Sequence, residues 1–142
     1  MSARKLVRHI MNKEVTTVDH GATLLDAALL MRTCGFRHLP VVKDGSVVGL
    51  VSDRDVQRAS PTISSGISPE EYNRIFETTP VEKIMARDLF TAKPDTPIKD
   101  VVTVMHERKL GSVPVIKEDN KLVGIVTVTD LLAFLNTLLA KK

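Results

Sequence analysis

The chain has 142 residues, of which 43% are hydrophobic and 26% charged, with a formal net charge of +3. This length allows one well-buried core, or two small half-domains that share one. The 20 basic residues are scattered and not interleaved with aromatics, which argues against a nucleic-acid partner. No apolar run is long enough to span a membrane. Since the N-terminus shows no secretory signal, we predict a cytoplasmic protein.

The first half of the chain resembles the second half at an offset of 74 residues. One extra residue in a turn of the second half changes this offset to 75. The landmarks recur in the same order, which indicates a true tandem repeat. The matched residues are Val7 with Val81, Met11 with Met85, Thr17 with Thr91, Asp26 with Asp100, Pro40 with Pro114, Gly49 with Gly124, and Asp55 with Asp130. We therefore predict one copy at 1–60, a linker with a short helix at 61–80, and a second copy at 81–142.

Each copy carries local signals for the order β-α-β-β-α. In the first copy, Thr23 can cap a helix, Gly35 can end it in a left-handed conformation, and a turn is expected at 44–45. Cys34 ends this helix, and we expect a buried or half-buried structural thiol there. The predicted elements are a strand at 15–18, the helix between the two caps, strands at 39–42 and 47–51, and a second helix starting at Ser52.

The linker has two parts. The stretch ASPTISSGIS at 59–68 is small, polar and rich in turn formers, so we expect a loop. Ser68 followed by a proline and two glutamates predicts a helix over Pro69–Thr78. Its apolar residues would pack on the module or on a partner subunit.

In the second copy, an extended segment is expected at 89–92, and strands at 113–116 and 122–126 flank a turn at 119–120. Thr96, with Pro97 at the first helical position, predicts the start of its first helix. The last helix starts at Thr127 and carries more apolar surface than one intramolecular contact covers: Leu131, Leu132, Phe134, Leu135, Leu138 and Leu139. We therefore expect a homodimer.

The sharpest motif is GLVSDRD at 49–55, repeated as GIVTVTD at 124–130. In both, a strand turns directly into a helix that begins with a hydroxyl and has an acid three residues later. One interpretation is a capping box, in which the two side chains satisfy the first amides of the helix. The other is a ligand site, in which free amides attract phosphate and the carboxylate binds a ribose.

These motifs, together with Ile-Met at the start and Pro-Val in the middle of each copy, resemble the cystathionine β-synthase (CBS) domain, two of which form a Bateman module. The resemblance covers about 7–59 and 81–139, and the linker helix resembles the CBS portion of acetoin-utilisation-type proteins. It implies an α/β (α+β) fold in which tandem β-α-β-β-α motifs form one pseudo-two-fold module. Two clefts at the strand ends would bind AMP, ADP or ATP as a regulatory ligand, and some relatives bind S-adenosylmethionine.

Carried across by position, the resemblance implies two sets of nucleotide-binding residues. In the first cleft Asp55 would bind ribose, and Ser52 and Arg54 would face phosphate, with Arg37 or His38 as a further cation nearby. The residues that would enclose the base are Thr17, Val18, His38, Leu39 and Pro40. The second set is Thr91, Ala92, Ser112, Val113, Pro114, Thr127, Thr129 and Asp130. Since arginine binds phosphate strongly, we expect tighter nucleotide binding at the first cleft.

The resemblance implies a signalling module that senses energy or a metabolite and acts on an unidentified effector protein. The sequence contains no phosphate-binding glycine loop, nucleophile elbow or general acid–base pair, so we expect no enzyme activity. The four histidines lack metal-ligand spacing, and we expect neither a metal nor an obligatory cofactor. The alternatives are a purely structural dimerisation module with empty clefts, or a module that binds S-adenosylmethionine.

Overall fold

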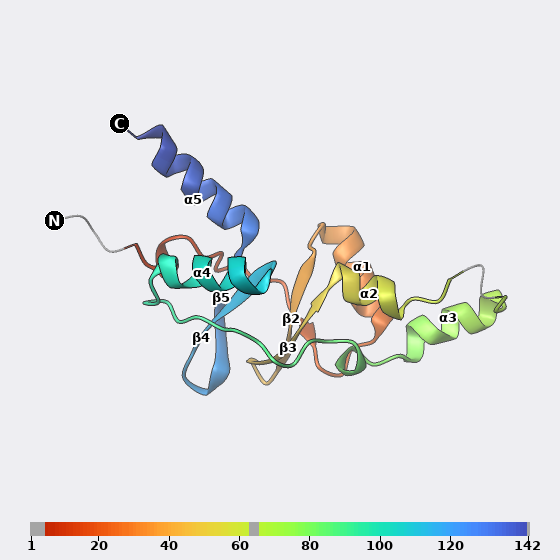
Figure 1. Cartoon of the computed structure of the whole chain (residues 1–142). Coiled ribbons are helices and arrows are strands. Elements are labelled where there is room, and N and C mark those ends of the chain that lie inside the picture. Colours follow the sequence, from red (N-terminus) through yellow and green to blue (C-terminus); the bar gives the residue numbers. More distant parts are fainter. Residues whose placement is uncertain (1–4, 63–65, 142) are drawn as a thin grey trace. The chain divides into compact units, whose positions relative to one another are not determined.

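In a computed structural model, described for residues 5–62 and 66–141, the chain has an α/β fold (Figure 1). Its elements, in order, are η1 (Val7–His9), β1 (Val18–Asp19), α1 (Leu24–Cys34), β2 (His38–Lys43), β3 (Ser46–Ser52), α2 (Asp53–Ala59), α3 (Pro69–Thr78), η3 (Val81–Lys83), α4 (Ile98–Arg108), β4 (Ser112–Lys117), η4 (Glu118–Asn120), β5 (Lys121–Thr127) and α5 (Val128–Ala140). The predicted order β-α-β-β-α is confirmed in the first copy, and the second copy differs only in its first strand.

The chain divides into two compact units whose boundaries differ from those of the sequence copies. The central unit is Thr16–Leu89, and the terminal unit combines Met1–Val15 with Phe90–Lys142. Each copy thus contributes its Ile-Met segment to the unit built mainly from the other copy. Val7 is fully buried in the core of the terminal unit, and Val81 in that of the central unit.

This exchange is held by backbone hydrogen bonds to the second strand of each hairpin, β3 or β5. Asn12 exchanges two bonds with Ile125 of β5, at 2.9 and 3.0 Å, and Ala86 exchanges two with Leu50 of β3, at 2.9 and 3.0 Å. The segment also passes directly over the glycine of the Gly-x-Val motif. A Cβ on Gly49 would lie 2.3 Å from Sδ of Met85. The glycine is therefore required by the fold, because it makes room for the exchanged segment.

The central unit is a three-stranded sheet covered on one side by α1 and α2 (Figure 1). β1 pairs parallel to β2, which pairs antiparallel to β3 through the predicted turn, where Asp44 and Gly45 have φ of 52° and 83°. The predicted caps of α1 are confirmed, with Thr23 at its start and Gly35 at its end. The buried core consists of Val18, Leu24, Ala27, Leu39, Val41, Val51, Val56, Val81 and Met85.

The linker helix α3 belongs to the central unit and has the predicted bounds. Ser68 caps it by accepting a hydrogen bond from the amide of Glu71 at 3.1 Å. The helix packs on α1, and Phe76 contacts the central core. Of the loop predicted before it, residues 63–65 lie outside the described residues.

In the terminal unit, β4 and β5 form an antiparallel hairpin, and the strand predicted at 89–92 is reduced to one bridge between Ala92 and Val115. α4 starts one residue later than predicted, with Pro97 as its cap. The hydroxyl of Thr96 accepts a hydrogen bond from the amide of Lys93 at 2.9 Å, so it closes the preceding turn and does not cap the helix. α5 extends away from the end of β5 (Figure 1).

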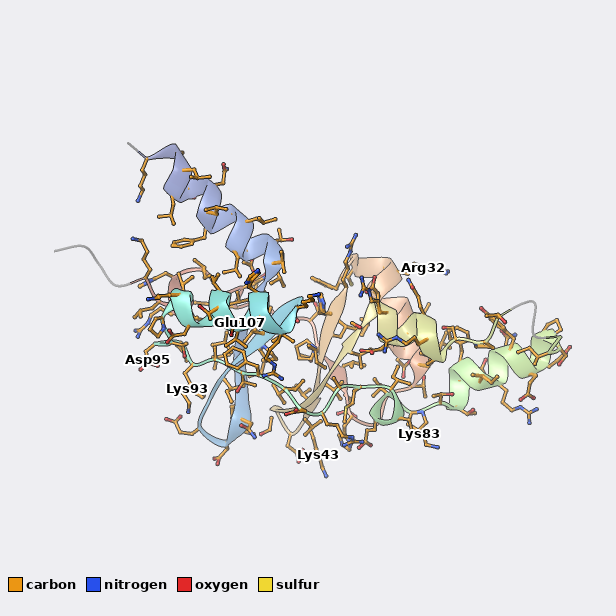
Figure 2. The ribbon with its side chains drawn as sticks, viewed as in Figure 1. Arg32, Lys43, Lys83, Lys93, Asp95 and Glu107 are labelled. Carbon is orange, nitrogen blue, oxygen red and sulfur yellow. The ribbon has the colours of Figure 1, made fainter. Side chains whose placement is uncertain are left out.

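The prediction of a buried or half-buried thiol at Cys34 is wrong, because this residue is exposed. α1 ends here, and its last turn extends beyond the core, to which the helix contributes Leu24 and Ala27. Arg32 on the same turn, labelled in Figure 2, is also exposed.

Candidate functional site

The candidate site of the central unit lies where β3 turns into α2. Oδ2 of Asp55 accepts hydrogen bonds from the amide and the hydroxyl of Ser52, at 2.8 and 2.9 Å. The amide of Asp55 donates in return to the Ser52 hydroxyl at 3.2 Å. Both side chains are half-buried. The capping-box interpretation is therefore confirmed here.

The same geometry recurs in the terminal unit, where β5 turns into α5. Oδ2 of Asp130 accepts from the amide and hydroxyl of Thr127 at 2.8 and 3.1 Å, and its own amide donates to that hydroxyl at 3.3 Å. Thr23 and Asp26 at the start of α1 form a third such box, outside both predicted sites. A capping box is thus a general device of this fold, and it does not by itself identify a ligand site.

The expectation of free amides at these helix starts is wrong for two of the first three positions. The amide of Asp53 donates to the carbonyl of Arg37 at 2.9 Å, and that of Val128 to Gly111 at 3.2 Å. The third amide of each helix is bonded to the capping hydroxyl. The cause is the direct turn from strand to helix. It brings the first helical residue against the residue that precedes the paired strand, which is Arg37 before β2 and Gly111 before β4. These helix starts therefore offer phosphate fewer donors than predicted.

The first predicted set comes together at one end of β2. The register places His38 opposite Ser52 and Leu39 opposite Val51, while β1 brings Val18 opposite Val41. Leu39 and Pro40 are fully buried, with the main chain included, so they lie behind the surface of this site. By contrast, the cationic side chains of this set, Arg37 and Arg54, are exposed, and Thr17 is half-buried.

His38 is the residue of this set whose pKa is shifted by its surroundings. Burial lowers its pKa below the ordinary value of 6.5, Asp53 raises it, Arg37 lowers it and Asp55 raises it. Asp53 did not appear among the predicted site residues. The sequence signal that could have suggested it is its position directly after the capping Ser52.

The second set comes together at the equivalent end of β4. Ser112 lies opposite Thr127 and is only 4% exposed. Its hydroxyl has no hydrogen-bond partner among residues 5–62 and 66–141. Val113, Pro114 and Ala92 are buried with it, Thr91 is half-buried, and Thr129 is exposed. A buried hydroxyl without a partner is uncommon in native proteins and marks a place where a ligand or water can bind.

Three grooves are lined by residues that belong to neither set. One of about 470 Å³ in the terminal unit is lined by α4, α5 and the segment at 5–6, and one of about 200 Å³ in the central unit by α1 and α3. A third groove, of about 340 Å³, lies at the other end of β4 from Ser112. Its charged lining residues are Arg8, Lys93, Asp95, Lys117 and Glu118. Figure 2 labels Lys93 and Asp95. None of these three grooves contains a predicted nucleotide-binding residue.

Metal sites and membrane-spanning helices are both absent from the described parts of the chain. No group of three His, Cys, Asp or Glu side chains there is arranged as a metal site. No helix there is long and apolar enough to cross a membrane.

The fold and the two capped strand ends define a tandem pair of small α/β repeats with matching candidate sites. Residues 7–62 and 81–137 match the family model of the CBS domain. The chain belongs to this family and is a CBS domain pair.

Solved structures of CBS pairs resemble the chain over nearly its whole length. A putative acetoin utilization protein (AcuB) from Vibrio cholerae has a TM-score of 0.80 at 30% identity, over 96% of this chain and 94% of that one. The CBS domain pair of protein MJ0100, solved with 5′-methylthioadenosine and S-adenosyl-L-methionine, has a TM-score of 0.78 at 26% identity, over 95% and 98%. The cytosolic domain of the Mg²⁺ channel MgtE, solved with ATP, has a TM-score of 0.72 at 26% identity, over 92% and 48%.

Among curated relatives, the homoserine O-acetyltransferase of Methanococcoides burtonii is 32% identical over 126 residues. That match covers 88% of this chain and 23% of the relative. The chain therefore spans about a quarter of that protein, and the similarity concerns its CBS part.

Proposed function

We propose that the chain is a cytoplasmic regulatory module that binds an adenine nucleotide (AMP, ADP or ATP) and catalyses no reaction itself. The observation that carries this proposal is the group of charged residues at the start of α2. His38 lies opposite Ser52, which is followed by Asp53, Arg54 and Asp55 at the start of α2. Of the neighbouring charges, Asp53, Arg37 and Asp55 shift the pKa of this half-buried histidine. Related CBS pairs that bind ATP, 5′-methylthioadenosine or S-adenosylmethionine support an adenosine ligand.

In this proposal the nucleotide lies along the end of β2. Both capping hydrogen bonds of Asp55 fall on Oδ2. Its second oxygen, Oδ1, would accept hydrogen bonds from the hydroxyls of a ribose. The same oxygen lies 3.7 Å from Nη1 of Arg58. Arg37 and Arg54 would bind phosphate in the bidentate way that guanidinium groups favour. Thr17, which is half-buried, would contact the base, and the buried Leu39 and Pro40 would form the wall behind it.

Regulation would follow from differential binding. A ligand that binds one conformation of the pair more tightly shifts the population toward it, and so changes affinity for another chain. The effector would be a separate protein of unknown identity. The competing function is a purely structural dimerisation module.

Titration calorimetry of three alanine variants tests the proposal. Asp55→Ala should weaken AMP binding roughly tenfold or more, since a hydrogen bond to a charged group is lost. Asp130→Ala should have at most a smaller effect on AMP binding. Asp26→Ala is the matched control: it breaks the same kind of capping box at α1 and should leave AMP affinity unchanged. Equal losses from Asp55→Ala and Asp130→Ala would refute the difference between the sites.

A thermal-shift screen separates the two functions. A ligand that binds only the folded protein raises the unfolding midpoint by mass action. We expect AMP, ADP or ATP to raise it, with S-adenosylmethionine and NAD as comparisons. If none of them does, the dimerisation module is the better description.

The proposed state is a homodimer formed through α5. This helix carries exposed apolar side chains at Val128, Leu132, Leu135, Leu138 and Leu139, with Leu132 58% and Leu139 75% exposed. Burying such a stripe against a second copy removes apolar area from water. Light scattering should show a dimer at micromolar concentration, and Leu132→Glu should shift it to monomer; a wild-type monomer would contradict the proposal.

A further inference from the structure

The hydrogen bonds at the two helix starts determine how phosphate can be recognised. In α5 the amide of Val128 is bonded to Gly111 and that of Asp130 to Thr127. The equivalent amides of α2 are bonded in the same way, and α2 has only seven residues. Phosphate recognition in either copy must therefore come chiefly from side chains. This argument rests on the proposed function, because it assumes that the sites bind adenosine derivatives.

The side chains at the two sites differ in charge. At the start of α2, residues 36–39 and 52–56 contain two arginines, two aspartates and one histidine. At the start of α5, residues 110–113 and 127–131 contain one charged residue, Asp130. A phosphate there would lie near that carboxylate, and these two segments contain no cation to offset it. The nearest basic residue along the chain, Lys109, is exposed at the end of α4. Like charges at short range repel each other. The second site is thus suited to a ligand that is neutral or positively charged at this end.

Ser112 adds an independent reason to place a ligand at the start of α5. Its hydroxyl is 96% buried, given the 4% exposure of the residue, and has no protein partner among the described residues. It lies across the strand pair from Thr127, at the edge of the same helix start. An unpaired buried hydroxyl gains more from a hydrogen bond than an exposed one, because it has already lost its water. A ribose hydroxyl or an adenine nitrogen has the chemistry to pair with it.

We infer that the site at the start of α5 takes an adenosine derivative without a phosphate, such as a nucleoside or one with a 5′ thioether or sulfonium group. Phosphorylated adenosine is bound by the arginines beside α2. The two sites of the CBS pair therefore bind ligands of different charge. Arg54 and Thr129 occupy equivalent positions and determine whether a phosphate is bound. Arg37 and Gly111, also equivalent, add to the difference in charge.

Calorimetry with AMP and 5′-methylthioadenosine tests this division in the full chain. The wild type should bind one equivalent of each, and saturation with AMP should leave the affinity for 5′-methylthioadenosine unchanged. Arg54→Thr should weaken AMP roughly tenfold and leave 5′-methylthioadenosine unaffected, because an arginine–phosphate pair is lost. The reciprocal variant Thr129→Arg should raise the AMP stoichiometry from one to two. Both positions are exposed, so neither change should disturb folding.

A second variant reports on the buried hydroxyl. Ser112→Ala should raise the unfolding midpoint of the unliganded protein, because it removes an unpaired polar group, and should weaken 5′-methylthioadenosine severalfold while AMP affinity stays constant. A merely structural serine would leave both affinities unchanged, which would overturn the inference.

Two other outcomes would also overturn it. Competition between AMP and 5′-methylthioadenosine for one site, or equal weakening of both by Arg54→Thr, would show that charge does not divide the ligands. AMP binding to both sites of the wild type would do the same while leaving the proposed function intact. Failure of both probes to bind would instead refute the proposed function itself.

Discussion

The central and terminal units are two versions of one design, and they differ at a few equivalent positions. α1 ends on Gly35, whereas α4 ends on Lys109, which has the same left-handed backbone with φ of 55°. Two arginines lie in the segments 36–39 and 52–56 at the start of α2, whereas the equivalent segments at the start of α5 contain none. By contrast, the capping boxes and the crowded glycines are common to both units. Shared features therefore belong to the fold, and the features that differ are where ligand selectivity and local strain can be sought.

The largest effect that we predict tests the exchange of Ile-Met segments. Gly49→Ala would place a Cβ 2.3 Å from Sδ of Met85 and 3.0 Å from the carbonyl oxygen of Ala86. The methionine can move, but the backbone cannot, so the free energy of unfolding should fall by about 1–3 kcal/mol. Urea denaturation measures it.

Gly124→Ala is the matched variant in the terminal unit and should cost less. Its Cβ would lie 2.7 Å from Sδ of Met11 and 3.1 Å from the oxygen of Asn12, both looser contacts.

In a Met85→Ala background, Gly49→Ala should cost less than in the wild type, because the crowding atom is gone. Additive costs would show that the methionine does not cover the glycine.

The two helix ends offer the next comparison. Gly35→Ala should destabilise the protein by about 1 kcal/mol, since alanine disfavours the left-handed conformation while nothing lies within 4 Å of the new Cβ. Lys109→Gly should act in the opposite direction, with a gain of up to about 1 kcal/mol, because it relieves the same strain in α4. Both are read from thermal unfolding. A loss on Lys109→Gly would mean that the lysine makes a contact that outweighs its strain.

The accuracy of the sequence-based predictions depends on the range of the interactions involved. Thr23, Gly35, Ser52, Ser68 and Thr127 were placed correctly at helix ends, because a cap bonds within three or four residues of itself. The exchange of Ile-Met segments was missed, since its hydrogen bonds join positions more than 30 residues apart, such as Leu50 and Ala86. The sequence showed that these motifs recur together, but not that they contact each other.

The candidate site shows the same limit. Of the two interpretations of the hydroxyl–acid pairs, the capping box is confirmed. The amides expected to be free are bonded to Arg37 and Gly111, which are 16 and 17 residues away. Burial was equally hidden from the sequence. Ser112 and His38 occupy equivalent positions, yet only the fold shows that one is a buried hydroxyl and the other a half-buried imidazole.

The smallest effect that we predict concerns this pair of equivalent residues. Burial lowers the pKa of His38 below 6.5, so the unfolded chain binds a proton more readily than the folded protein does. Stability from this residue is therefore fully present above pH 6.5 and is lost as the pH falls through the lowered pKa. His38→Gln should flatten this part of the curve, measured as urea midpoints between about pH 5 and pH 8. Since the terminal unit has Ser112 at this position, Ser112→Ala should leave the pH dependence unchanged. An equal slope in wild type and His38→Gln would show that the charges of Asp53 and Asp55 fully offset the burial of the imidazole.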